Sequence, residues 1–448
     1  MQKLFGTDGI RGHVGRKPFT TNGLNALGCA LSRFFSHDHA TSMPKSDDER
    51  PFLFAWDGRQ SGDFILKNLA PHFLQAGFSV KTLGLLPTPG LSFMVQHVGA
   101  VGGIMISASH NPPTDNGLKI FSHTGHKLDG AEEARIAQLF EKQCTEARQA
   151  TFPHSPLLAE EPPTPYVRSL VKEAAALNLQ GVHLVIDAAN GAGSHLACEV
   201  LKETGAHITP LACTPSGDNI NVNCGATCPE GMQQRVKDVG ATLGFALDGD
   251  GDRLIVCNHK GQLLDGDQLL AHLALDLKER GMLSPAVVVS TVLANTGLEV
   301  FLKQHGIALQ RTDVGDRWLA EGMQETGAQL SAEPSGHFLF ADEITGDGLK
   351  TALRLLHLLS RKEEKTLLSL FTPYQQAKCN IPTEKLKPGV TKNIRAVQEA
   401  LKEQLPPNTR LVLRPSGTEP VLRLMLEAEK EESCKEALSQ ARSQLTKT

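Results

Sequence analysis

The sequence predicts an α/β protein with three similar α/β domains, built on mixed or mostly parallel sheets, and a smaller α+β domain at the C-terminus. Short, β-rich apolar runs alternate with longer stretches of helical periodicity through most of the chain, a pattern typical of sheets covered by helices. After residue 370 the alternation gives way to a different order of elements. A chain of 448 residues is also too long for one hydrophobic core, which favours about three or four domains.

The first α/β unit begins with "FLFAW" (52–56) and "VKTLGL" (80–85), which we expect to be strands on either side of a helix near 65–76. The second unit repeats this plan, with strands at 182–187, 207–213 and 242–248 and helices near 195–204 and 230–238. The third unit repeats it again, with strands at 286–293 and 307–313 and helices near 297–305 and 316–326. Three units of the same plan indicate three similar domains.

A further helix over 267–280 is expected to open the third unit, because its leucines and one alanine keep one face apolar. The charged "SRKEEK" (360–365) and "FTPYQQ" (371–376) then suggest a hinge. The predicted C-terminal domain contains a helix near 391–404, strands at 410–414 and 420–429, and a polar helix to the end. The polar, proline-rich segment 142–165 is predicted to be a linker. We therefore expect four domains, over 1–155, 156–257, 258–368 and 369–448.

The composition is that of an ordinary soluble globular protein, with 40% hydrophobic and 21% charged residues. A net charge of −4 gives no reason to expect nucleic acid or an anionic membrane as a partner. No run of 18 or more apolar residues occurs, and "MQKLFGTDGIRG" lacks the character of a secretion signal. A cytoplasmic location is the resulting expectation.

The nine cysteines are scattered and odd in number, which does not indicate a disulfide framework. Cys224 and Cys228 could begin a zinc site, but no second Cys/His pair at suitable spacing follows nearby.

The stretch "LDGDGDRL" places Asp248, Asp250 and Asp252 at alternate positions directly after a predicted strand. Alternation turns the three carboxylates to one side, and the intervening glycines let the backbone fold closely around a ligand. Three neighbouring negative charges repel unless a cation or basic groups neutralise them. Oxygen ligands favour Mg²⁺ over zinc as the occupant.

A solvated acidic turn is the simpler alternative for this loop. A calcium EF-hand is excluded, because Arg253 stands at the sixth position, where Gly is required, and His259 at the twelfth, where Glu is required.

The stretch "RPSGTEPVLR" (414–423) combines two guanidinium groups, two hydroxyls and a glycine turn, which suits it to hold a phosphate. The candidate residues are Arg414, Ser416, Gly417, Thr418 and Arg423. A hairpin turn with two surface arginines is the alternative. A weaker basic cluster, with Arg11, lies in "FGTDGIRG" (5–12).

Two further loops carry polar side chains. "AEPSGH" (332–337) sets Glu333, Ser335 and His337 close together, a set suited to sugar hydroxyls, although a structural turn explains it equally well. "DVGDRW" (313–318) places Asp316 near a predicted helix start, where helix capping alone could account for it.

The stretch "ISASHNPP" (106–113) follows an apolar, glycine-rich run. Ser109 is a candidate nucleophile or phosphate carrier, and His110 and Lys119 are candidate proton shuttles. The adjacency of Ser109 and His110 is weak evidence, because neighbouring side chains on an extended chain point to opposite sides. A structural polar loop is the alternative.

Together these stretches resemble the α-D-phosphohexomutase superfamily, which carries a phosphoserine loop, a metal loop, a sugar-binding loop and a phosphate loop. Here they are "SASHNPPTDNGLK", "DGDGDR", "EPSGH" and "RPSGTEP", in the family's order and over nearly the whole chain. "FGTDGIRG", "LLPTPG", "NINVNCGAT", "LDGDQLL" and "VGDRW" are most similar to the bacterial branch that acts on glucosamine phosphates. The resemblance implies four domains around a central cleft.

It also implies an isomerase, an intramolecular phosphotransferase, that interconverts glucosamine 6-phosphate and glucosamine 1-phosphate for UDP-N-acetylglucosamine and cell-wall synthesis. The reaction would pass through a phosphoserine enzyme and a sugar bisphosphate. Glucose 1,6-bisphosphate or glucosamine 1,6-bisphosphate would be the activating phosphate donor. The small-molecule partner would be a hexosamine phosphate, and a homodimer is left open.

The resemblance gives the candidate residues their roles. Ser109 would carry the phosphate, and one Mg²⁺ per chain would be held by Ser109, Asp248, Asp250 and Asp252. Arg253 would add a positive contact, and Lys119 is preferred to His110 for moving the hydroxyl proton. The substrate would be bound by Arg11, Asp316, Glu333, Ser335 and His337, and its second phosphate by the 414–423 loop.

Several positions depart from the glucosamine branch. Pro334 stands where Gln is usual, Ser331-Ala332 where a glycine pair is usual, Cys228 where His is common and Asp313 where Lys is common. "WDGRQSG" (56–62) also differs from the usual pattern, although Asp57 and Arg59 remain. The alternatives are a phosphomannomutase/phosphoglucomutase and a non-catalytic sugar-phosphate-binding protein.

Overall fold

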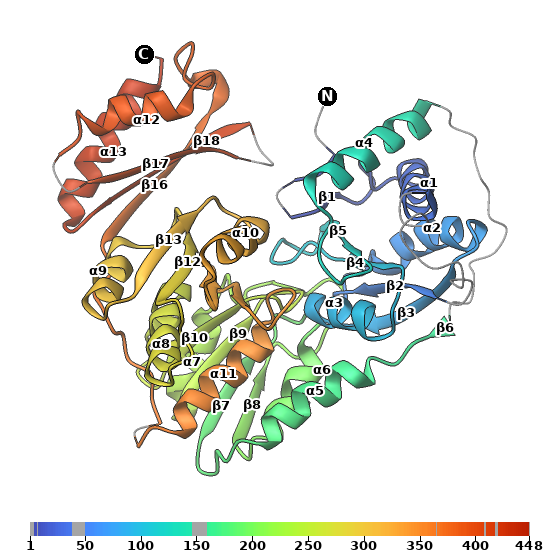
Figure 1. Ribbon diagram of the computed structural model, residues 1–448, viewed down its shortest axis with the longest axis horizontal. Helices are drawn as coiled ribbons and strands as arrows, with labels where there is room; N and C mark the ends of the chain where they lie inside the picture. Colours follow the sequence, from blue (N-terminus) through green and yellow to red (C-terminus); the bar gives the residue numbers. More distant parts are fainter. Residues whose placement is uncertain are drawn as a thin grey trace. The chain divides into compact units, whose positions relative to one another are not determined.

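The computed structural model describes residues 4–6, 8–37, 50–145, 159–363, 365–406, 409–416 and 420–447. The chain forms two compact units, and Figure 1 shows the helices and strands of each. The first comprises Met1–Leu269 and Ser335–Leu368, and the second comprises Leu270–Pro334 and Ser369–Thr448. None of the helices in the described part of the chain has the length and apolar character needed to cross a bilayer.

The first unit begins with a six-stranded mixed sheet in the order β1-β5-β4-β2-β3-β6. Its strands are β1 (Ile10–His13), β2 (Pro51–Trp56), β3 (Ser79–Leu85), β4 (Gly102–Ile106), β5 (Asp115–Ser122) and β6 (Ala159–Glu160). β2 runs parallel to β3 and β4, whereas β5 is antiparallel to both β4 and β1. The antiparallel turn from β4 to β5 therefore places residues 107–114 at one end of the sheet.

Helices cover both faces of this sheet: α1 (Thr21–His37), α2 (Gly62–Gln75), α3 (Thr88–His97) and α4 (Gly130–Thr145). Gly102 and Gly103 of β4 face opposite sides, because a Cβ on Gly102 would meet Phe35 of α1 and a Cβ on Gly103 would meet Val95 of α3. Phe35, Phe52 and Phe73 form the centre of the core on the α1 side, with the Phe52 and Phe73 ring centroids 4.1 Å apart. Aromatic burial of this kind anchors the sheet.

The second sheet of this unit has five strands in the order β11-β10-β9-β7-β8. They are β7 (His183–Asp187), β8 (His207–Leu211), β9 (Leu243–Leu247), β10 (Leu254–Asn258) and β11 (Leu263–Leu264). β7 is parallel to β8 and β9, and β9 and β10 form an antiparallel hairpin with Leu247 opposite Leu254. Residues 248–253 are the turn of that hairpin.

The helices associated with this sheet are α5 (Thr164–Ala175), α6 (Ser194–Lys202), α7 (Glu230–Val239) and α11 (Gly348–Ser360). Gly244 of β9 lets α7 approach closely, since a Cβ there would meet Met232 and Val236. The short strand β15 (Phe338–Phe340) also belongs to this unit.

The second unit contains α8 (Gly266–Glu279), whose first turn lies before the division, followed by β12 (Val287–Thr291), α9 (Thr296–Gln304), β13 (Ala308–Thr312), α10 (Asp316–Thr326) and β14 (Leu330–Ala332). β12 pairs in parallel with both β13 and β14. Val288 and Val289 of β12 are fully buried.

The C-terminal part of the second unit is a three-stranded antiparallel sheet, β16-β18-β17, with the helices α12 and α13. The elements are β16 (Gln375–Pro382), the 3-10 helix η2 (Thr383–Lys385), α12 (Ile394–Lys402), β17 (Arg410–Pro415), β18 (Val421–Ala428) and α13 (Glu431–Leu445). Buried Glu427 of β18 accepts hydrogen bonds from Thr296 N–H (2.9 Å) and Arg410 Nε (3.1 Å). It thereby attaches this sheet to the start of α9.

The predicted fold class is confirmed, and α10 spans the predicted helix at 316–326. The segment predicted as a linker, 142–165, contains the end of α4, the short strand β6 and the start of α5, and its residues 146–158 lie outside the described part. The hinge indicated by 360–365 and 371–376 stays a prediction. In this region α11 ends at Ser360 and β16 begins at Gln375.

Candidate active site

Ser109 lies in the loop between β4 and β5 and is completely buried. Its φ of 52° places it in the left-handed region, which a residue with a side chain enters only at an energetic cost. Its N–H donates to Ser107 Oγ at 2.8 Å, and Ser107 Oγ donates in turn to Asp57 Oδ2 at 2.6 Å. Ser107 therefore supports the conformation of Ser109.

A buried arginine, Arg59, donates hydrogen bonds to the backbone of the same loop. Arg59 Nε pairs with Asp57 Oδ2 at 2.8 Å, and its terminal nitrogens donate to the carbonyl oxygens of Ser109 (3.0 Å), Asn111 (2.8 Å) and Asp115 (2.9 Å). The planar guanidinium can satisfy several acceptors at once, which a lysine cannot do. The loop is thus clamped from the first sheet.

The second sheet contributes another contact to the serine loop. Asn221, which follows β8 in the chain, donates through Nδ2 to the carbonyl oxygens of Ser109 (2.9 Å) and Asn111 (3.0 Å). Its φ of 59° is also left-handed, a conformation that Asn tolerates better than most residues. The sequence does not predict a role for Asn221, because its contact with the serine loop depends on the fold.

The three aspartates of the β9–β10 turn are buried together. Asp248, Asp250 and Asp252 each offer a carboxylate oxygen, and these oxygens all lie within 4.8 Å of one another. The hydroxyl of Ser109 donates to Asp248 Oδ2 at 2.6 Å. The predicted serine and metal loops are therefore brought together.

Lys119 of β5 offsets the charge of these carboxylates. Its Nζ lies 2.7 Å from Asp250 Oδ2, 2.7 Å from Asp252 Oδ2 and 3.2 Å from Asp8 Oδ2, and the side chain is buried. Burial opposes the charged amine, but the charges of Asp250, Asp252 and Asp8 hold its pKa well above its usual value. Burial also opposes the charge of Asp252, yet Lys119 and His337 hold the pKa of Asp252 well below its usual range.

Asp248 behaves differently from Asp252. Burial, together with the charges of Asp252 and Asp250, raises the pKa of Asp248 well above its usual range. Asp250 Oδ1 is buried and has no hydrogen-bond partner among the described residues. A cluster of carboxylates that includes a buried oxygen without a hydrogen-bond partner fits a divalent cation with oxygen ligands, such as Mg²⁺.

His110 lies beside the Ser109 hydroxyl. Its Nδ1 is 3.4 Å from Ser109 Oγ and 3.1 Å from Arg253 Nη1. The left-handed turn at Ser109 brings these neighbouring side chains to the same side, which an extended chain would not do. Burial, assisted by the charge of Arg253, lowers the pKa of His110 to about 4, so the ring is neutral at pH 7.

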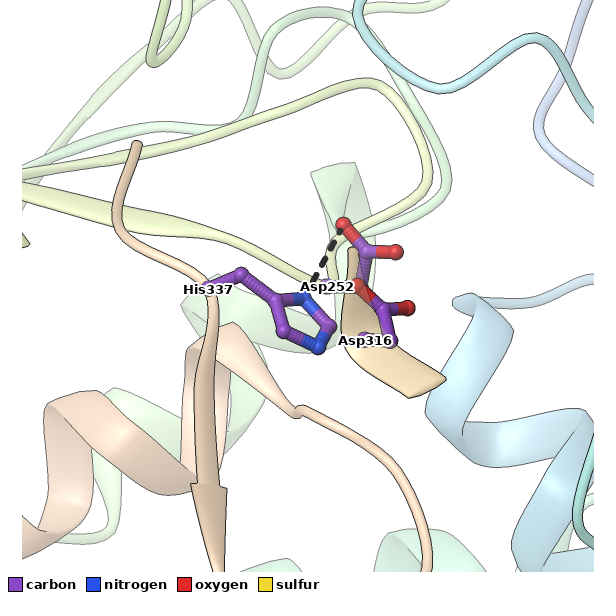
Figure 2. Close-up of side chains that lie close together, drawn as sticks. All are labelled: Asp252, Asp316 and His337. Atoms are coloured by element: carbon purple, nitrogen blue, oxygen red, sulfur yellow. Dashed lines mark ion pairs between the residues drawn. The ribbon is translucent and has the colours of Figure 1, made fainter. Parts of the chain in front are cut away.

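The segment ending in "SGH" approaches the acidic turn from the other side. The backbones of His337 and Arg253 form an isolated antiparallel β-bridge. The Nδ1 atom of His337 lies 3.9 Å from Asp252 Oδ1. Figure 2 shows its ring turned toward the Asp252 carboxylate. Gly336 permits this approach: its φ is 88°, and a Cβ there would lie 2.2 Å from Leu254 O. Ser335 precedes this glycine.

Arg11 is linked to the site through Asp8, which sequence reasoning missed. Arg11 Nη2 lies 2.7 Å from Asp8 Oδ2, and Lys127 Nζ lies 2.5 Å from Asp8 Oδ1. Burial opposes the Asp8 charge, but Lys119, Lys127 and Arg11 lower the pKa of Asp8 well below its usual range. In the sequence, Asp8 is visible only as the acidic residue of "FGTDGIRG". Its contacts with Lys119, Lys127 and Arg11 are known only from the fold.

The second unit carries Asp316 and Glu333. Asp316 is the first residue of α10, after Gly315. Glu333 is buried, and its Oε1 accepts a hydrogen bond from Gly315 N–H at 3.0 Å. The carboxylate of Glu333 therefore fixes the backbone just before the helix that presents Asp316.

The predicted phosphate loop connects β17 and β18. Arg414 and Arg423 stand opposite each other in the sheet, and Ser416 N–H donates to Val421 O at 2.9 Å. Burial and the charge of Arg423 lower the pKa of Arg414, while Glu333 acts in the opposite direction. Two facing guanidinium groups fit an anion. The predicted Gly417 and Thr418 lie outside the described residues.

Comparisons with known proteins match the whole architecture. Models of phosphoglucomutase/phosphomannomutase match in order: alpha/beta/alpha domain I at residues 2–147, domain II at 164–261, domain III at 265–376 and the C-terminal domain at 378–442. A solved structure of a phosphoglucomutase/phosphomannomutase family protein from Burkholderia thailandensis is similar, with a TM-score of 0.78 and 25% identity. That match covers 100% of this chain and 99% of the other.

Curated relatives are closer in sequence. A phosphoglucosamine mutase from Maricaulis maris is 38% identical, over 96% of this chain and 95% of its own length. A phosphoglucosamine mutase from Alcanivorax borkumensis is also 38% identical, over 95% of this chain and 94% of its own. Both alignments extend through the serine loop, the acidic turn and the C-terminal sheet. The chain therefore belongs to the phosphoglucosamine mutase family of the α-D-phosphohexomutase superfamily.

Proposed function

We propose that this protein interconverts glucosamine 6-phosphate and glucosamine 1-phosphate, with Ser109 as the phosphate carrier. The observation that supports this most directly is the 2.6 Å hydrogen bond from Ser109 Oγ to Asp248, within a buried group of three carboxylates. A serine hydroxyl held next to a candidate Mg²⁺ site is the arrangement that reversible phosphoryl transfer needs.

In the proposed cycle the Oγ–P bond of phosphoserine breaks as the phosphorus bonds to the free hydroxyl oxygen of the sugar monophosphate. The product is a sugar 1,6-bisphosphate. After this intermediate turns over, its other phosphoryl group returns to Ser109, and the second sugar monophosphate leaves. Glucose 1,6-bisphosphate or glucosamine 1,6-bisphosphate would charge the unphosphorylated enzyme by the same reaction.

Asp248, Asp250 and Asp252, with a phosphate oxygen on Ser109, would hold one Mg²⁺. When bound, the ion offsets negative charge on the transferring phosphoryl group. Arg59 and Asn221 hold the serine loop in place, and Arg253 supplies a further positive charge beside this loop.

Two side chains are placed to move the proton of the sugar hydroxyl. Lys119 Nζ lies among the carboxylates of Asp250, Asp252 and Asp8. His110 Nδ1 lies 3.4 Å from Ser109 Oγ, and its ring is neutral at pH 7 and able to accept a proton. Lys119 is the preferred group by family resemblance, but the neighbouring carboxylates hold its pKa well above its usual value, so its amine has to lose a proton before it can accept one. His110 is the alternative.

The substrate and its resting phosphate need further residues. The residues proposed to contact the sugar phosphate are Arg11, Asp316, Glu333, Ser335 and His337. The phosphate that is not reacting would be held by Arg414, Ser416, Gly417, Thr418 and Arg423. The facing arginines of β17 and β18 support this role.

The carrier is tested by incubating the purified protein with Mg²⁺ and glucose 1,6-bisphosphate, followed by peptide mass spectrometry. We expect one phosphoryl group on the Ser109 peptide of the wild type and none on Ser109→Ala. No gain in the wild type, or an equal gain in the variant, would refute the assignment. Substrate identity is tested by comparing kcat/KM for glucosamine, glucose and mannose phosphates, where a clear preference for mannose phosphate would overturn the glucosamine assignment.

A further inference from the structure

Two cysteines that are 15 residues apart in the chain face each other on the second sheet of the first unit. Cys198 lies in α6 and Cys213 lies two residues after β8. Their sulfur atoms are 3.8 Å apart. Neither residue takes part in the serine loop or the acidic turn, so this thiol pair has no role in the proposed reaction.

The fold fixes the position of Cys213 closely. Ala212, just before it, has a left-handed φ of 47°. Asn190 N–H donates to Ala212 O at 2.6 Å, and Ala188 N–H donates to Leu211 O at 3.2 Å. The backbone thus turns sharply at the end of β8 and presents the Cys213 side chain toward α6. The end of β8 and helix α6 therefore place the two thiols beside each other.

Both cysteines are half-buried and lie in the wall of an open pocket of about 680 Å³. A pocket of this size admits a molecule as small as hydrogen peroxide. Ser194, Lys202 and Pro210 line the same pocket. A disulfide requires an S–S distance of about 2.05 Å, so the sulfurs need to approach by less than roughly 2 Å.

We propose that Cys198 and Cys213 form a peroxide-sensitive dithiol that closes to an intramolecular disulfide. The Cys198 thiolate attacks one oxygen of hydrogen peroxide, the O–O bond breaks, and the sulfur becomes a sulfenic acid while hydroxide leaves and takes up a proton as water. Cys213 sulfur then attacks the Cys198 sulfur, forming the S–S bond and releasing the second water. The two thiols are oxidised by two electrons in total, and one peroxide is reduced.

The local electrostatics give the two cysteines different parts in this reaction. A hydrogen bond with Cys213, together with the charge of Lys202, lowers the pKa of Cys198 to about 7 although burial opposes this. The hydrogen bond with Cys198 and burial raise the pKa of Cys213. Because the thiolate is the nucleophile, Cys198 should react with peroxide first and Cys213 should resolve the sulfenic acid.

A metal site explains the pair less well. Among the described residues, the groups of three ligands close enough to share an ion do not include either cysteine. Structural zinc sites use four ligands and catalytic ones use three. An oxidisable pair is therefore the better interpretation of two facing thiols in an open pocket.

The test uses the wild-type protein at low concentration. It is treated with hydrogen peroxide, blocked with N-ethylmaleimide, digested without reductant and analysed by mass spectrometry. We expect the Cys198 and Cys213 peptides to be joined with loss of two hydrogens, and dithiothreitol to separate them. Buried Cys257, whose pKa burial raises to about 11, should remain a free thiol and serves as the internal control.

Two variants sharpen the result. In Cys213→Ser, the same peroxide treatment should leave a sulfenic acid on Cys198 that dimedone traps, whereas Cys198→Ser should greatly slow oxidation of Cys213. The proposal is overturned if both wild-type cysteines still react with N-ethylmaleimide after peroxide. It is equally overturned if Cys198 proceeds to the sulfinic acid while Cys213 stays reduced, or if the cross-link joins two chains.

Discussion

The hydroxyl of Ser109 donates a hydrogen bond of 2.6 Å to Asp248, a residue 139 positions further along the chain. The two side chains come from turns at the ends of two different sheets, β4–β5 and β9–β10. Because burial and its acidic neighbours raise the pKa of Asp248, this carboxylate gains from any positive charge placed beside it. The pair therefore joins the proposed phosphate carrier to the candidate cation site.

Replacing Asp248 by Asn should abolish most of the activity while leaving the fold intact. The substitution removes one negative oxygen ligand from the carboxylate group, so we expect Mg²⁺ to bind more weakly and kcat to fall by roughly a hundredfold or more. Isothermal titration with Mg²⁺ and a steady-state mutase assay measure the two effects. Asp238→Asn, at an exposed position of α7, is the matched control; equal loss in both variants would contradict the assignment.

Arg59→Lys should impair the serine loop without removing a charge. The ammonium cannot replace the several hydrogen bonds that Arg59 makes to the carbonyls of Ser109, Asn111 and Asp115. Asn221 still donates to the carbonyls of Ser109 and Asn111, but loss of the Arg59 hydrogen bonds should lower the free energy of unfolding by about 1–3 kcal/mol, and kcat should fall. Urea denaturation and the mutase assay check this, and wild-type values for both would show that the clamp is unimportant.

Gly336→Ala should destabilise the first unit and disturb His337. The left-handed backbone alone costs about 1–2 kcal/mol, and the clash of the new Cβ with Leu254 O should add about 1–3 kcal/mol. Gly77→Ala is the control, because Gly77 has a similar φ of 91° with nothing within 4 Å of its Cβ position. If thermal unfolding shows equal losses for the two variants, the close approach at Gly336 carries no cost.

The buried His72 of α2 should make stability depend on pH. Burial lowers its pKa in the folded protein from 6.5 to about 4, so the unfolded chain binds more protons between these values. The contribution of His72 is fully present above pH 6.5 and is lost as the pH falls toward 4. His72→Gln should flatten the change in the free energy of unfolding between pH 6.5 and 4.5, measured with urea; an unchanged slope would mean that His72 does not contribute.

Much of the site could be predicted from the sequence because its chemistry is concentrated in short loops. Alternating carboxylates after an apolar strand indicate the acidic turn, and two arginines around a glycine turn indicate the phosphate loop. Composition does not distinguish Ser109 from Ser107 as the candidate phosphate carrier. Only the family resemblance favours Ser109. The structure gives Ser107 a separate part, since its hydroxyl supports the Ser109 backbone.

The residues that sequence reasoning missed act through contacts between distant segments. Asp8 is recognisable only once Lys119 and Lys127 surround it. The strand β1 has no clear alternating pattern, and its strand form depends on pairing with β5. Local propensity cannot reveal features that tertiary pairing creates.

The contact from Asn221 to the Ser109 carbonyl has a consequence for synthesis on the ribosome. When the first sheet has emerged, the serine loop still lacks this support and also lacks the carboxylate of Asp248. The nascent N-terminal part therefore holds Ser109 without the two contacts that come from the loops of the second sheet. The proposed phosphate carrier is complete only when the second sheet has folded against the serine loop.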